Sequence, residues 1–262
     1  MAGSAKGDGN VRPTATDPGG ERFRCQICGQ LVAVLITLLG DGFCPVCGSH
    51  LWARPPADRT VAAVARRIDD LAGQLRRDRF SHQWIVDLCG TACADGDLAE
   101  IVKLDGIEEL LLNDTAVTDA GLPGLARQTS LEVLDLDGTS ITDAGLLELG
   151  GLSRLEMLSL GGTPVTDFGL AYLEPLEAVW CLDLEDAELD GSGLRRLRSW
   201  KTLEWLSLRS TDVGDTALAH LLPLRGLKWL DIQETPMTLA GYLTLSRELP
   251  ACRIAWSRRA SS

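Results

Sequence analysis

The chain has 262 residues, of which 45% are hydrophobic and 24% charged, a composition typical of a soluble globular protein and too apolar for a disordered one. The net charge of -12 is unevenly distributed, because residues 1–82 carry 11 Lys and Arg against 8 Asp and Glu and are therefore basic. An acidic body such as the remainder of the chain is a poor general binder of nucleic acid, since phosphate requires positive charge.

Residues 1–21 are rich in Gly, Pro, Ser, Thr and Asp, lack hydrophobic periodicity and are predicted to form a disordered tail. They contain no apolar stretch of signal-peptide type. The longest apolar run, Leu31 to Leu39, has about half the length that a membrane-spanning helix needs. We therefore expect a cytoplasmic protein without a membrane partner, in a reducing compartment where clustered cysteines bind metal more often than they form disulfides.

The next segment, residues 22–53, contains two Cys-x-x-Cys pairs. Their four sulfur atoms come from Cys25, Cys28, Cys44 and Cys47. Four thiolates at this spacing can close a tetrahedral zinc shell with bonds of about 2.3 Å. The pattern resembles the zinc-ribbon family, in which two such turns are joined by a β-hairpin, and the resemblance implies a structural zinc ion. Two disulfides are the alternative, iron could occupy the same thiolates, and His50 could replace one ligand.

Residues 54–82 are predicted to form a linker and an N-terminal capping helix. From Asp58 or Thr60 to about Arg79, apolar residues recur at three- and four-residue steps, as they do in an amphipathic helix. Such a helix would cover the open end of the domain that follows. The alternative is a basic helix that binds nucleic acid, because arginines fall largely on its other side: Arg66, Arg67, Arg76 and Arg77.

From residue 83 to residue 256 the sequence repeats every 24 residues. Positions 1, 4 and 6 of the repeats are apolar with one polar exception, and position 9 is threonine except at Ala187. The seven repeats begin at Gln83, Ile107, Leu131, Leu155, Val179, Leu203 and Leu227, and an eighth start at Ala251 places Ile254 and Trp256 in a closing strand. No repeat can bury its apolar face alone, so the repeats must stack on one another.

The repeated pattern Leu-x-x-Leu-x-Leu-x-x-(Asn/Thr)-x-(Leu/Ile/Val) resembles the leucine-rich repeat family, in particular its 24-residue bacterial type with Thr-Asp-x-Gly-Leu in the second half. This resemblance implies an α/β solenoid. Its right-handed coil would carry a parallel β-sheet on the concave face and short helices on the convex face. Residues 257–262 are expected to form a tail.

The repeat over residues 131–154 illustrates the expected local chemistry. We expect Thr139 to hydrogen-bond the backbone of the neighbouring turn, and Thr142 and Asp143 to start a short helix. The fifth repeat departs from this pattern, because Ala187 replaces the threonine and Gly191 replaces the helix-start aspartate, with Asp190 as a candidate replacement. We expect this repeat to lack one polar rung and to be the softest part of the solenoid.

Strand side chains alternate, so positions 3, 5 and 7 of each repeat are predicted to line the concave sheet. Trp205 and Trp229 should lie side by side there, because neighbouring strands are about 4.8 Å apart. Tryptophan and arginine often dominate binding energies. The candidate partner-binding residues are Asp135, Met157, Asp183, Trp205, Arg209, Trp229 and Asp231. The alternatives are a solvated acidic sheet whose tryptophans pack only on each other, and binding through the convex face.

These features predict a non-enzymatic protein-interaction module or scaffold. The chain has three histidines, at positions 50, 82 and 220, and none lies in a recognisable nucleophile or metal motif. Three alternatives remain. One is a nucleic-acid-associated regulator that uses the ribbon and the Arg-rich helix, and another is a ubiquitin-ligase-like substrate adaptor. The third is an enzyme that depends on Asp135, Asp183 or His220.

Overall fold

The computed structural model divides the chain into two compact units, Met1–Ala62 and Ala63–Ser262. It describes residues 60–78 and 80–258 in full and, before them, the backbone of residue 59 and of five short strands. These strands are β1 (Arg22–Arg24), β2 (Leu31–Ala33), β3 (Leu35–Ile36), β4 (Gly42–Phe43) and β5 (His50–Trp52). β1 pairs antiparallel with β2, and β4 pairs antiparallel with both β3 and β5. The expected tail over residues 1–21 and the candidate zinc ligands Cys25, Cys28, Cys44 and Cys47 lie outside the described residues.

The helix expected up to about Arg79 is shorter than predicted. Helix α1 (Arg59–Asp70) ends where Ala72 adopts a left-handed φ of +59°. There the backbone N–H of Ala72 donates to the carbonyl of Asp69 and that of Gly73 donates to the carbonyl of Ile68, both at 2.9 Å. These two bonds form the usual C-terminal motif of a helix, and they satisfy carbonyls that would otherwise lack partners.

A strand follows where the helix was expected to continue. β6 (Gln74–Arg77) pairs antiparallel with β7 (Trp84–Asp87), and its buried Leu75 lies opposite the buried Val86. The helical spacing of apolar residues in the sequence therefore extends beyond the end of α1. It includes Leu75, which is buried but lies on strand β6. Two of the four arginines assigned to the helix, Arg76 and Arg77, consequently lie on β6.

In the described part of the chain, nine strands form one sheet in the order β14 to β6, and every pairing except that of β6 is parallel. Paired residues in the repeats are 24 positions apart, so the sequence repeat is also the structural repeat. The closing strand extends two residues beyond its expected end at residue 256. The remaining strands are β8 (Ile107–Leu111), β9 (Val133–Asp135), β10 (Met157–Ser159), β11 (Cys181–Asp183), β12 (Trp205–Ser207), β13 (Trp229–Thr235) and β14 (Arg253–Arg258).

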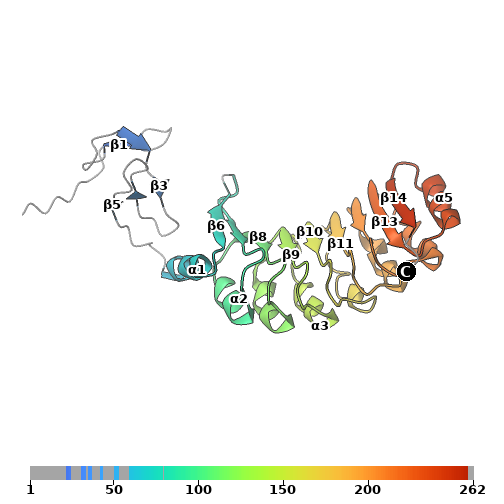
Figure 1. Ribbon diagram of the computed structural model, residues 1–262, viewed down its shortest axis with the longest axis horizontal. Helices are drawn as coiled ribbons and strands as arrows, with labels where there is room; N and C mark the ends of the chain where they lie inside the picture. The colour runs from blue at the N-terminus through green and yellow to red at the C-terminus, as the bar shows by residue number, and fades with distance from the viewer. Residues whose placement is uncertain are drawn as a thin grey trace, which may run out of the picture. The chain divides into compact units, whose positions relative to one another are not determined.

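Short helical segments, most of them 3-10 turns, connect the strands. Figure 1 shows these segments on the convex side of the unit Ala63–Ser262, with the sheet along its concave side. Fully buried side chains, such as Leu134, Leu136 and Ile141, fill the space between the two layers. None of the helices in the described residues is both long and apolar enough to span a membrane. The segments are α2 (Asp95–Ile101), η1 (Asp119–Arg127), α3 (Asp143–Leu146), η2 (Leu147–Leu149), η3 (Gly169–Ala171), η4 (Ser192–Ser199), η5 (Asp215–Ala217), α4 (Leu218–Leu221) and α5 (Leu239–Glu248).

The position-9 threonines act within their own coil, not between coils as predicted. The hydroxyl of Thr139 donates to the carbonyl of Leu136, three residues earlier, at 2.6 Å. It therefore closes the turn that follows the strand. The same bond, at 2.6 to 2.9 Å, is made by Thr115, Thr163, Thr211 and Thr235. Ala187 has no hydroxyl, so the carbonyl of Leu184 receives only the backbone N–H of residue 187, at 3.3 Å.

The bonds that join one coil to the next come from the helix-start residues. Thr142 caps its own helix, because its hydroxyl accepts from the backbone N–H of Ala144. Its own N–H and hydroxyl donate to the carboxylate of Asp119 in the preceding coil, at 2.8 and 2.6 Å. Equivalent pairs are Thr118 with Asp95, Thr166 with Asp143, and Thr238 with Asp215. We call this series the Thr–Asp ladder; it is interrupted where Gly191 and Gly214 occupy the two positions.

Candidate functional site

The parallel register places three rows of side chains on the concave sheet face. The position-3 row consists of Ile85, Glu109, Val133, Met157, Cys181, Trp205, Trp229 and Arg253. The position-5 row consists of Asp87, Leu111, Asp135, Ser159, Asp183, Ser207, Asp231 and Ala255. The position-7 row follows two residues later in each repeat and includes Asn113, Asp137, Glu185 and Arg209. Six of the seven candidate binding residues fall in the first two rows, and Arg209 falls in the third.

The two tryptophans of the position-3 row are direct partners on adjacent strands. Trp205 on β12 pairs with Trp229 on β13, and both side chains are half-buried. The guanidinium of Arg253, on β14, lies 5.0 Å from the centre of the Trp229 ring, a cation–π contact. Arg253 was not among the predicted binding residues, although it stands 24 residues after Trp229 and so continues the same row. The end of this row therefore already holds one cation against an aromatic ring.

The aspartates of the position-5 row have a local structural role that repeat spacing alone did not reveal. Asp135, Asp183 and Asp231 each accept a hydrogen bond from the backbone N–H two residues later, at 2.9 to 3.1 Å. Such Asx turns help to end the strand. Each carboxylate uses one oxygen in this way. None of the three forms an ion pair with another described residue.

Burial and mutual repulsion raise the pKa of carboxyl groups on this face. Burial is the main cause that raises the pKa of Asp137 to about 7, and the neighbouring Asp135 and Asp183 add to it, although the N–H of Gly161 opposes the shift with a 2.5 Å hydrogen bond. The pKa of Asp135 is also raised, again chiefly by burial. Asp135, Asp137 and Asp183 thus form an acidic group without ion pairs to described residues, and a bound cation would favour their ionised forms.

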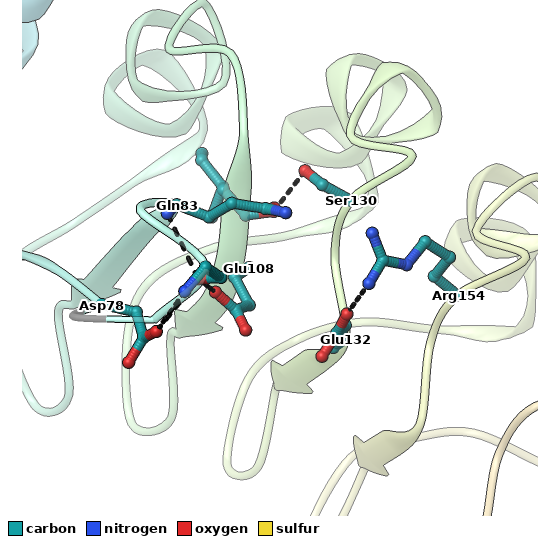
Figure 2. Close-up of polar contacts among 8 residues, drawn as sticks. Asp78, Gln83, Glu108, Ser130, Glu132 and Arg154 are labelled. Atoms are coloured by element: carbon teal, nitrogen blue, oxygen red, sulfur yellow. Dashed lines mark hydrogen bonds and ion pairs between the residues drawn. The ribbon is translucent and has the colours of Figure 1, made fainter.

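Two of the four glutamates at position 2, along the edge of the same sheet, are compensated by ion pairs. Figure 2 shows Glu132 and Arg154, from the two ends of the repeat over residues 131–154, pointing toward each other in an ion pair. Glu204 pairs with Lys228 at 2.7 Å in the same way. Arg209 on the sheet face is likewise engaged, because its guanidinium contacts Glu185 and Glu234. The position-5 aspartates Asp135, Asp183 and Asp231, like Glu109 and Asp137 on the same face, form no such ion pair with a described residue.

The structure does not bring together the residues of the enzyme alternative. Asp135 and Asp183 lie on the sheet, whereas His220 lies on α4 in the helical layer. His220 lines a depression of about 440 Å³ at the interruption of the Thr–Asp ladder, with Asp190, Ser192, Asp212, Gly214, Asp215, Thr216 and Ala217. In the fully described segments, no group of three or more His, Cys, Asp or Glu side chains is arranged to hold a metal ion.

The arginine of α1 that faces the repeats is engaged in the fold. The guanidinium Nε of Arg67 donates to the carboxylate of Asp97 at 2.6 Å, and a second nitrogen contacts the same oxygen. Asp97 is 8% exposed, and its other oxygen accepts the backbone N–H of Ala94 at the start of α2. Arg77 stacks on Trp84, 4.5 Å from the ring centre. Arg67 therefore fastens helix α1 to the first repeat.

No protein family profile matches the chain, and no curated protein matches its sequence significantly. Solved structures do match its fold. The internalin InlF of Listeria monocytogenes is 18% identical with a TM-score of 0.51, over 76% of this chain and 55% of that protein. Internalin C2 of the same organism is 20% identical with a TM-score of 0.51, over 67% of this chain and 74% of that protein.

A leucine-rich-repeat protein of Leptospira interrogans is 21% identical with a TM-score of 0.49, over 60% of this chain. The two internalins show that the chain has the leucine-rich-repeat fold. The fold class expected over residues 83–256 is thereby confirmed, with its sheet and helices on the predicted faces. The likeness is one of fold, and this chain spans 38% of the leptospiral protein and 55% of InlF.

Proposed function

We propose that the leucine-rich-repeat unit is a non-enzymatic interaction module that binds a protein partner on its concave sheet face. The observation that carries this proposal is the pairing of Trp205 with Trp229 in direct register beside the uncompensated aspartates of the position-5 row. Half-buried tryptophans can supply large apolar contact area at small entropic cost. A sheet held by continuous hydrogen bonding needs little ordering on binding, which supports useful affinity from a limited surface.

Quantitative affinity capture from native lysate tests this function with matched variants of the full chain. Trp205→Ala/Trp229→Ala should lose the specifically captured proteins. Phe168→Ala is the control, because Phe168 is an aromatic residue that is 85% exposed next to η3 on the helical side. Loss with the double variant and retention with the control supports the concave face. An unchanged set of proteins in the double variant, or a loss confined to the control, contradicts it.

We also propose that Cys25, Cys28, Cys44 and Cys47 hold one structural zinc ion. Each Cys-x-x-Cys pair stands in the sequence between two strands that pair antiparallel, the first between β1 and β2 and the second between β4 and β5. This arrangement, and a donor set of four thiolates, fit a closed structural zinc site with no open position for substrate. Zinc thiolates require reduced cysteines, so the proposal places the protein in a reducing compartment such as the cytoplasm.

Metal analysis of the purified full chain tests the zinc site independently of the partner. The wild-type chain should contain about one zinc per chain, and Cys25→Ser/Cys44→Ser should contain almost none. Cys89→Ser/Cys252→Ser is the matched control and should retain the wild-type content, because neither cysteine belongs to a Cys-x-x-Cys pair. Undiminished zinc in the first variant would place the site elsewhere, and iron in the wild type would correct the metal.

A further inference from the structure

We propose that the concave sheet face binds an extended basic polypeptide segment that crosses the strands and presents a Lys or Arg side chain at every third residue. This inference rests on the proposed function and specifies the chemistry of the partner. Its anchors are the carboxylates of Asp135, Asp183 and Asp231. We call these three residues the aspartate row; Ser159 and Ser207 stand between its members.

The spacing of the aspartate row carries the argument. Its members lie on every second strand, so their backbone positions are about 9.6 Å apart, twice the spacing of adjacent strands. A polyproline II segment advances about 3.1 Å per residue and has three residues per turn. Side chains at every third position therefore project from the same side at intervals of about 9.3 Å. Basic residues at that interval match all three carboxylates with little accumulated error.

Other regular conformations fit the aspartate row less well. In a β-strand, residues three apart point to opposite faces, because side chains alternate. In an α-helix, residues seven apart share a face, but they are separated by about 10.5 Å, so the mismatch grows along the row. An extended segment with a three-residue period is thus the conformation that satisfies both distance and direction.

The charge on this face is available to such a partner. At position 2, Glu132 pairs with Arg154 and Glu204 pairs with Lys228, whereas no member of the aspartate row forms an ion pair with a described residue. The carboxylates of the aspartate row accept hydrogen bonds, which is what a basic side chain donates.

The position-3 row offers the apolar part of the recognition. It runs parallel to the aspartate row and contains Met157, Trp205 and Trp229. Lysine and arginine side chains combine an aliphatic stem with a charged end, so the stem can pack on these residues while the charge reaches the carboxylates. The contact of Arg253 with Trp229 shows that a ring in this row accepts a guanidinium. The two rows together therefore suit long basic side chains.

Fluorescence anisotropy with labelled synthetic peptides and the full chain tests the inference. The probe is a peptide of repeated Arg-Pro-Pro triplets, and the control peptide has the same composition with its arginines contiguous. The phased peptide should bind about tenfold more tightly than the contiguous one, and both should weaken as salt is raised. Asp183→Asn/Asp231→Asn should remove most of this preference. These substitutions keep an oxygen that can accept the backbone N–H two residues later, so the fold is preserved.

Asp69→Asn/Asp105→Asn removes the same charge from exposed sites outside the sheet and should leave the preference intact. Equal affinity for the two peptides, or an equal effect of the two double variants, would overturn the inference. Either result would mean that binding depends on charge alone and not on the spacing of the basic residues. Absence of binding to both peptides would also overturn it. With any of these outcomes, the proposed function would still stand if Trp205→Ala/Trp229→Ala loses its lysate partners. Failure of this inference can therefore be distinguished from failure of the proposed function.

Discussion

A single missing hydroxyl at Ala187 separates the fifth repeat from its neighbours. Ala187 is buried and lies between Thr163 and Thr211 in the stacked coils, both of which donate a buried hydrogen bond to their own turn. Restoring the hydroxyl would satisfy the carbonyl of Leu184 in the same way. The threonine hydroxyl thus closes the turn after the strand in five of the repeats.

Ala187→Thr should stabilise the chain by about 0.5–1 kcal/mol, the usual net value of one intramolecular hydrogen bond. The free energy of unfolding from urea denaturation measures this, with an unchanged m-value. Ala187→Val is the matched control, because valine has nearly the shape of threonine without its hydroxyl. The turn-closing role would be wrong if threonine and valine had the same effect.

Asp137 should make stability depend on pH. Its folded pKa of about 7 exceeds the unfolded value, so the folded chain binds this proton more tightly. The contribution of this group to stability is therefore greatest at acidic pH and is lost as pH rises through about 7. Asp137→Asn should raise the free energy of unfolding at pH 8 by about 1–3 kcal/mol and leave it almost unchanged near pH 4. Chemical denaturation across this range would refute the account if the variant showed no pH-dependent gain.

Residue pairs on the sheet were predictable, whereas the use of their polar atoms was not. A repeat of constant length places Trp205 beside Trp229 whatever the details of each coil. The acceptor bond of Asp135 to its own backbone depends on turn geometry that a repeat pattern does not encode. The same holds for the Thr139 hydroxyl, which serves its own coil and not the next.

The Thr–Asp ladder joins one helical segment to the next. Asp119 receives two hydrogen bonds from Thr142 of the following coil, in addition to its place at the start of η1. The interruption at Gly191 and Gly214 coincides with the depression beside His220. The strength of the join between consecutive coils therefore varies along the solenoid.

Asp119→Ala should lower the free energy of unfolding by about 1–3 kcal/mol, because it leaves the partly buried N–H and hydroxyl of Thr142 without their acceptor. Thermal and urea unfolding measure the change. Asp105→Ala, at an exposed position before β8, should change stability by less than about 0.5 kcal/mol. Equal effects of the two variants would show that the ladder does not couple the coils.

The strands and their order followed from the repeat, but the N-terminal helix did not keep its predicted length. Apolar spacing through Leu75 fits both a helix and a buried strand position, and pattern alone does not separate them. The left-handed conformation of Ala72 ends the helix before Leu75, and an alanine does not predict such a turn from sequence. The four candidate zinc ligands lie outside the described residues, so the zinc site stays a prediction.

For the leucine-rich-repeat unit as a whole, the central claim is that the concave sheet face contacts the partner. Side-chain oxidation by hydroxyl radicals, followed by mass spectrometry, measures the solvent accessibility of the concave and convex faces in one experiment, because each face carries oxidisable side chains. Complex formation with a captured partner should protect Met157, Trp205 and Trp229 and leave Phe168 and Tyr172 unchanged. Protection of Phe168 and Tyr172, with continued oxidation of the two tryptophans, would contradict the account.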